Sequence, residues 1–213
     1  VGYSAQRGVT TGHSNIGIGS VAQYNLSDGV RNVAMGMGAM ENGNVQGEDN
    51  TAIGHNSQNQ LTSGIDNTSL GAYSLDANQT GNRNTAVGHS SLTLCTGSDN
   101  TAVGYQSGAG VTSGAKNVFV GRDTGSGNTL TGNESTVVGQ YAGNQLSSGG
   151  RNALFGYQAG FYISTGVENT CIGSFAGAAQ NSDMAGANGN VIIGEETMGG
   201  GGSSYSVVIG YQT

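Results

Sequence analysis

The residues of this chain that could do chemistry are few and widely spaced. There are three histidines, two cysteines and one adjacent pair of glutamates, Glu195 and Glu196. Histidine and cysteine are the usual ligands of zinc, and paired carboxylates act as acid and base in glycoside hydrolases. Whether any of these side chains can work together depends on the elements that position them.

A five-residue phrase of the type Asn-Thr-Ala-Val-Gly returns along the whole chain. Its closing glycines are 16 to 18 residues apart, except for one interval of 21. So short a period is typical of a stacked repeat protein, in which one repeat cannot bury its apolar face alone. Since 17 residues hold two short strands and two turns, the sequence predicts an all-β fold, a parallel β-solenoid (β-roll) of about twelve coils. The closing glycines are Gly2, Gly19, Gly36, Gly54, Gly71, Gly88, Gly104, Gly121, Gly139, Gly156, Gly173, Gly194 and Gly210.

Residues 1–213 are expected to form a single repeat domain that is a fragment of a longer chain, because the sequence starts and stops inside a repeat. The coil 174–194 is irregular, being four residues longer than its neighbours. The 41 glycines fall in register with apolar residues, and proline is absent. The absence of proline fits a fold in which each coil donates N–H groups to the next.

The expected stacking keeps the reactive residues apart, since neighbouring coils lie about 4.8 Å from each other. His55 and His89 are two coils and roughly 10 Å apart, too far to share a metal ion. Cys95 and Cys171 are five coils and roughly 24 Å apart, which excludes a disulfide within one chain. The two adjacent glutamates would point to opposite faces of a strand. The sequence therefore predicts no catalytic residue, no metal site and no cofactor.

Composition argues against two classes of partner. The net charge is −7, with only six Lys and Arg residues. Nucleic acids and anionic membrane surfaces both require clustered basic residues. No apolar run approaches the roughly 18 residues of a membrane span, so neither nucleic-acid binding nor membrane insertion is expected.

Alternate residues of a strand face opposite ways, so positions two and four of the phrase share one face. Position four is apolar throughout and is expected to form the core. Position three would then point outward, and it becomes bulky in the later coils. Because soluble monomers avoid an exposed apolar stripe, we expect a homotrimer, a three-chain parallel fibre with this row buried between chains. The candidate interface residues are Phe119, Val137, Leu154, Ile192 and Val208.

Four further rows accompany the phrase. A small residue three places after each closing glycine predicts either a tight bend or a chain–chain contact. An aliphatic residue in the second half of the coil, such as Leu26 or Leu61, is expected to form the far wall. The phrase's Asn should hydrogen-bond to its equivalents along the stack. The residue before it is charged in nine consecutive coils, mostly with alternating sign, and is expected to set register rather than to stabilise strongly. These residues are Arg31, Asp49, Asp66, Arg83, Asp99, Lys116, Glu134, Arg151 and Glu168.

The irregular coil supplies the candidate receptor-contact loop. Insertions in solenoids map to loops on one face, which is often the binding face. We expect the inserted residues to project beyond the regular wall and to contact a receptor, whereas a tolerated surface insertion is the alternative. The loop residues are Gln180, Asn181, Ser182, Asp183 and Met184.

The segment NTAVGYQSG (Asn100–Gly108) followed by VTSGAKN, and FGYQAG (Phe155–Gly160) followed by ISTGVEN, resemble two related groups of proteins. One is the head repeat of trimeric autotransporter adhesins, whose NSVAIG-type coils form a left-handed β-roll trimer. The other, which is more similar, is the NTAxGYQAG repeat of phage tail fibres, often followed by a self-cleaving chaperone domain. The coil here is longer than that of the adhesin head.

The resemblance implies an extracellular fibre segment on a virion or a cell surface that attaches to a host glycan or protein receptor. A bacterial adhesin head is the alternative within this class. Two other classes are kept as alternatives. A polysaccharide-degrading tailspike would need catalytic carboxylates, and an ice-binding solenoid would need a flat threonine array, of which Thr51, Thr68, Thr85 and Thr101 form a short one. This row is expected to belong to the core face, and it gives way to Val118, Ala153 and Val191 in later coils, which argues against ice binding.

Overall fold

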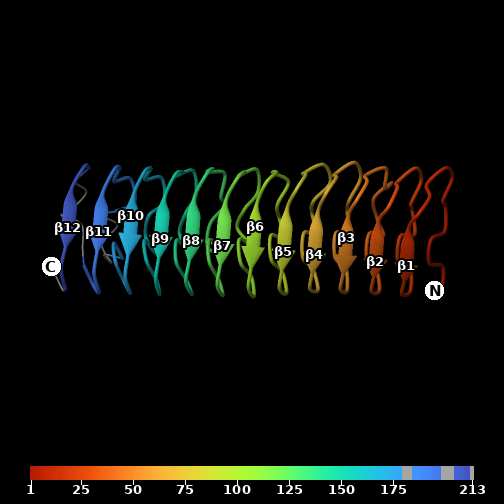
Figure 1. Cartoon of the computed structure of the whole chain (residues 1–213), viewed down its shortest axis with the longest axis horizontal. Helices are drawn as coiled ribbons and strands as arrows, with labels where there is room; N and C mark the ends of the chain where they lie inside the picture. The colour runs from red at the N-terminus through yellow and green to blue at the C-terminus, as the bar shows by residue number, and fades with distance from the viewer. Residues whose placement is uncertain (179–183, 198–203, 212–213) are drawn as a thin grey trace. The chain divides into compact units, whose positions relative to one another are not determined.

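A computed structural model describes residues 1–178, 184–197 and 204–211. The chain divides into two compact units, Val1–Gln106 and Ser107–Thr213, and every strand is three residues long (Figure 1). The first unit contains β1 (Ile16–Ile18), β2 (Val33–Met35), β3 (Thr51–Ile53), β4 (Thr68–Leu70), β5 (Thr85–Val87) and β6 (Thr101–Val103). The second contains β7 (Val118–Val120), β8 (Thr136–Val138), β9 (Ala153–Phe155), β10 (Thr170–Ile172), β11 (Val191–Ile193) and β12 (Val207–Ile209).

Within each unit, consecutive strands pair in parallel and in the register of the repeat. Thr51 of β3 lies beside Thr68 of β4, and Thr170 of β10 lies beside Val191 of β11. Each coil therefore contributes one strand to a parallel sheet and then returns through turns to the next strand. The predicted all-β parallel β-solenoid is confirmed.

The core lies on the other side of the strands from the side that the sequence suggested. In β1–β11 the middle residue, which is position three of the phrase, is buried, and both of its neighbours are partly or fully exposed. Ala102 is 0% exposed, for example, whereas Val103 is 39% exposed. The prediction that position four forms the core was therefore wrong, although the alternation on which it rested is present.

The reason for this reversal is that two positions of the coil share one space in the core: the middle residue of the strand and the residue six places later. We call this arrangement the volume exchange, because a large side chain at one position goes with a small residue at the other. In β1–β5, a small middle residue is followed six places later by a large side chain that is buried, as in Ala34 with Met40. In the second unit the large residue is in the strand, and glycine takes the later place. A Cβ atom on Gly160 would lie 2.7 Å from Leu154 Cδ2, and one on Gly125 would lie 2.5 Å from Phe119 Cε1. A small residue in the strand thus marks a core position that is filled from the opposite wall.

The remaining walls agree with the sequence. The aliphatic row of the second half of the coil is fully buried, as predicted, at Leu26, Leu61 and Leu146. The row of small residues is also buried within the chain, and its N–H groups point back to the closing glycines, as from Ala39 to the carbonyl of Gly36 at 3.4 Å. Of the two explanations given for this row, the tight bend is the one that the structure shows.

The bends place many non-glycine residues in the left-handed region of backbone conformation. The charged row shows this regularly, with φ of 58° at Arg31 and 64° at Asp99. The closing glycines have larger values that L-residues rarely adopt, such as 137° at Gly36, where a Cβ would also collide with the carbonyl of Gly54. The closing glycine is therefore required by conformation and by space.

The Asn row forms the predicted ladder in the interior. Asn50 donates its backbone N–H to Asn32 Oδ1 at 3.0 Å, and its Nδ2 donates to the same oxygen at 3.0 Å. The Nδ2 of most of these Asn residues also donates to a glycine carbonyl of the following coil, as from Asn50 to Gly64 at 2.8 Å, and that of Asn169 donates to Ala187. Since Asn50 is fully buried, these bonds satisfy polar groups that water cannot reach.

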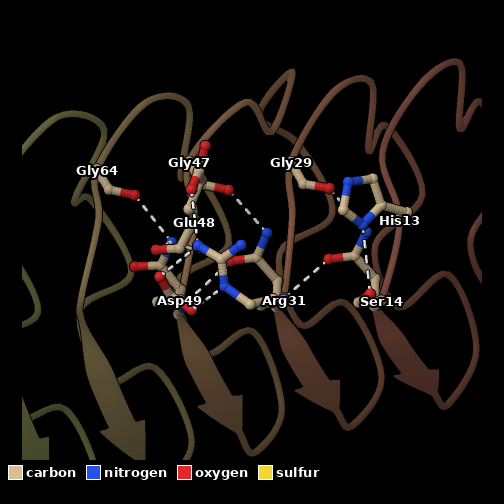
Figure 2. Close-up of polar contacts among 11 residues, drawn as sticks. His13, Ser14, Gly29, Arg31, Gly47, Glu48, Asp49 and Gly64 are labelled. Carbon is tan, nitrogen blue, oxygen red and sulfur yellow. Dashed lines mark hydrogen bonds and ion pairs between the residues drawn. The ribbon is translucent and has the colours of Figure 1, made fainter.

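The charged row lies beside the ladder and at the surface. Arg31 contacts Asp49 at 2.6 Å and Glu48 at 2.8 Å (Figure 2). Its hydrogen bond lowers the pKa of the Asp49 carboxyl. Equivalent ion pairs join Arg83 to Asp99, Lys116 to Glu134 and Arg151 to Glu168. Because the participating side chains are about half exposed, such pairs contribute little to stability.

Substitution of one residue of the Asn ladder tests how much the ladder contributes to stability. Asn84→Ala leaves the N–H of Asn100 and the carbonyl of Gly97 without their partner, so we expect the free energy of unfolding to fall by roughly 3 kcal/mol. Asn84→Ser is the matched control and should cost less, because Ser135 occupies this place in its own coil and its Oγ still accepts a backbone N–H. Equal losses in urea unfolding would contradict the proposed role of the ladder.

The volume exchange predicts a compensating pair of substitutions. Leu154→Ala alone should leave a cavity and cost about 2–5 kcal/mol, and Gly160→Leu alone should clash with Leu154. The double variant reproduces the arrangement of Ala86 and Leu92 in the first unit, where Leu92 has φ of 48°. It should therefore be more stable than either single variant in urea unfolding. Additive losses would show that the two residues do not fill the same space.

Candidate functional site

The outward strand face of each unit, defined as positions two and four of the phrase in its strands, exposes a row of apolar side chains. Position four is apolar in every coil, yet Leu70 is 47% exposed and Ile172 is 41% exposed. The two positions include no charged residue in any strand. The position-four residues are Ile18, Met35, Ile53, Leu70, Val87 and Val103 in the first unit and Val120, Val138, Phe155, Ile172, Ile193 and Ile209 in the second.

Position two of the same face carries the threonine row. Thr51, Thr68, Thr85 and Thr101 lie side by side in register across β3–β6. All four are outward and at least partly exposed. The assignment of this row to the core, which spoke against an ice-binding surface, was wrong.

The residues predicted to form the trimer interface are not on this face. Phe119, Val137, Leu154 and Ile192 are each 0% exposed within the single chain, where they fill the interior of the coil. Val208, in β12, is partly exposed. The four buried residues cannot contact a second chain while the coil is folded, so their assignment to an interface between chains was wrong. In β1–β11, positions two and four of the phrase face outward, and position three does not.

The predicted receptor loop lies mostly outside the described residues. Gln180, Asn181, Ser182 and Asp183 belong to that part, so their role stays a prediction. Met184 is described and is fully buried. It occupies the far-wall row of its coil, where Leu146 and Ile163 are found in the preceding ones, so it cannot project toward a receptor. The expectation for Met184 was wrong because the four added residues precede it and leave the wall itself unchanged.

An aromatic ladder follows the strands along one edge of each unit, in the turn just after the closing glycine. In the first unit His55 packs on Tyr73 with ring centroids 5.1 Å apart, Tyr73 on His89 at 5.8 Å, and His89 on Tyr105 at 5.5 Å. Tyr73 and Tyr105 are 37% and 47% exposed. The row is therefore a continuous aromatic strip at the surface.

The second unit carries a similar strip. Tyr141 packs on Tyr157 at 6.4 Å, and Tyr157 packs on Phe175 at 5.1 Å. The guanidinium of Arg122 lies 5.9 Å from the centre of the Tyr141 ring. Sequence reasoning missed both strips because some members stand one place and others two places after the closing glycine. The signal was the recurrence of Tyr and His at these two places.

The potentially reactive residues do not assemble into a site. Within residues 1–178, 184–197 and 204–211, no three His, Cys, Asp or Glu side chains are grouped so that they could hold a metal ion. Glu195 and Glu196 lie exposed in the turn after β11. His13 lies in a different row, beside Ser14, while His55 and His89 belong to the aromatic ladder.

Both cysteines are free, as predicted, and the structure shows that both are buried. Burial raises the pKa of the Cys95 thiol to about 11 and that of the Cys171 thiol to about 12. Because the thiolate is the nucleophilic form, both side chains behave as small apolar residues of the core at neutral pH.

No protein-family model, curated protein sequence or solved structure matches the chain. The described residues include no helix with the length and hydrophobicity needed to cross a bilayer. The outward strand face and the aromatic ladder are therefore the surfaces from which function has to be inferred.

Proposed function

We propose that the chain is a structural and adhesive segment of an extracellular fibre, on a virion or a cell surface, in which three parallel copies pack through the outward strand face. The fibre holds an attachment surface at a distance and contacts a glycan or a protein receptor of the host. The observation that carries this proposal is the apolar row that position four makes in each unit, whose members include Leu70 at 47% exposed and Ile172 at 41% exposed.

Three properties of this face favour burial between copies of the same chain. Soluble monomers rarely leave a large contiguous apolar patch in water. Each copy has a net charge of −7, so a face free of charged residues is the one through which copies can approach with least repulsion. Finally, the strands repeat in register, so parallel copies offer matching residues at every level. A closed ring of three is one of the symmetric arrangements that such a contact permits.

The repeat itself supports the same class of function. The NTAVGYQSG segment of residues 100–108 resembles the repeats of phage tail fibres and of trimeric adhesin heads. A phage tail fibre and a bacterial adhesin head would use the same packing of chains, and they differ in the particle that carries the fibre. The proposal assigns a mechanical and adhesive role to the chain and no catalysis.

Sedimentation of the purified chain tests the proposal. The sequence mass is 21.2 kDa, and we expect a species of about three times this mass. Val103→Asp places a charge on the outward face and should dissociate the trimer into folded monomers, whereas Ser63→Asp, in the exposed return bend, should leave it intact. Ala102→Asp, one residue away but buried, should prevent folding. A folded parent chain that sediments as a monomer would contradict the proposal.

The threonine row favours a second candidate function, binding to ice. Four threonines project outward in register from β3–β6, with aliphatic residues beside them. Such a flat array presents hydroxyl and methyl groups at the regular spacing of about 4.8 Å between strands.

An ice-recrystallisation assay distinguishes this function from the first. If it holds, the parent chain should keep ice grains small, and Thr68→Lys with Thr85→Lys should abolish the effect. Thr62→Lys, away from the face, is the matched control. Grain growth equal to that in buffer would remove this candidate.

A further inference from the structure

We propose that the aromatic ladder of the first unit, formed by His55, Tyr73, His89 and Tyr105, binds an extended glycan whose sugar rings lie along the stacking direction. The inference rests on the proposed function, because it names the surface by which the fibre segment would attach. The proposed receptor contact is then the aromatic ladder in the regular coils, and not the inserted loop that the sequence suggested.

The geometry of the ladder suits a linear polymer. Its rings follow one another at 5.1 to 5.8 Å between centroids, because each comes from a successive coil and coils repeat at about 4.8 Å. One pyranose unit of an extended polysaccharide advances by a similar length. A chain of sugars can therefore place consecutive rings against consecutive coils.

The chemistry of the ladder is amphipathic in the way that sugars require. A pyranose has an apolar C–H face, which packs on aromatic rings, and a rim of hydroxyl groups, which need hydrogen-bond partners. Tyr73, His89 and Tyr105 offer a ring and a polar atom in the same side chain. Further polar groups flank the strip, since Ser90 Oγ lies 3.0 Å from His89 Nδ1 and the partly exposed Gln106 follows Tyr105.

Stability alone does not account for the choice of residues. Stacked aromatic pairs contribute about 0.5–1.5 kcal/mol each, and phenylalanine would provide this equally well. In the first unit every member instead carries a hydroxyl or a ring nitrogen, and Tyr73 and Tyr105 keep more than a third of their surface in water. Polar atoms at an exposed aromatic strip point to a ligand with its own hydroxyl groups.

A second copy of the chain is the less suitable occupant of this strip. The outward strand face is wholly apolar or threonine, which suits contacts between copies better than a strip that carries polar atoms. The ladder lies in the turns beyond it and mixes rings with polar groups, as do sites that bind solvated ligands in part by water-mediated bonds. The ladder therefore remains available when copies pack through the strands.

A glycan array, in which glycans are immobilised on a surface, tests the inference on the assembled full chain. The probes are linear β1,4-glucan, β1,4-linked N-acetylglucosamine and polygalacturonate, which distinguish neutral, acetamido and acidic sugars. We expect at least one to bind, and the double variant Tyr73→Ala with Tyr105→Ala to reduce binding at least tenfold. Because the chain has no tryptophan, quenching of tyrosine fluorescence by the same glycan in solution should be lost in that variant.

Two controls distinguish a loss of glycan binding at the ladder from a loss of folding or assembly. Tyr162→Ala removes an aromatic pair with Phe161 at 4.8 Å outside the ladder and should leave glycan binding unchanged. Sedimentation of every variant reports assembly independently, so loss of binding in an intact trimer supports the ladder, and a monomeric parent chain would contradict the fibre proposal instead. Failure of all three probes to bind, or equal binding by the double variant, would overturn the inference.

Discussion

Hydrogen bonding between successive coils is the constraint on which the rest of the structure depends. A strand of three residues cannot stand alone, and its backbone groups are satisfied only by the strands of the coils before and after it. The Asn ladder completes this pairing where the strand begins, since Asn50 joins the backbone of its own coil to Asn32 behind and to Gly64 ahead. The rigid repeat of the ladder fixes the level of every other row.

The narrow cross-section that follows from this pairing explains both the interior and the surface. Each level of the first unit has room for one large side chain between the strand and the opposite wall, as Ala34 and Met40 show. Apolar residues in excess of that volume have to face outward. Met35 and Leu70 are thus exposed because Met40 and Leu75 already fill the interior of their coils, and their apolar character is consistent with a second chain as partner.

The architecture could be predicted from the sequence because the repeat places the same residue types at a nearly constant interval along the chain. The closing glycines predicted the coils, and the recurring Asn predicted a ladder whose bonds are found at Asn32 and Asn50. Which side chains of each strand face the core could not be predicted in the same way. An apolar row is compatible with a core or with an interface between chains, and only the pairing of Leu154 with Gly160, six residues apart, distinguishes the two.

The candidate site was harder to predict than the fold for a related reason. Tyr73 stands two places after its glycine and His89 one place after, so a strict count along the repeat separates residues whose rings touch. Contact between them arises from the left-handed conformation of the turn, with φ of 57° at Tyr73. A backbone angle of this kind has no reliable signature in a non-glycine residue.

The left-handed residues also bear on how the protein folds. Each costs the free chain roughly 1 kcal/mol, and two or three occur in most of the described coils, among them Arg31, Met40 and Asp49. An isolated coil would relax out of this shape, whereas a coil that meets a finished neighbour has its carbonyls and ladder oxygens already in place. Folding should therefore resemble the growth of a crystal from a seed, with a slow first pair of coils, rapid addition at the open end, and melting that starts from the ends inward.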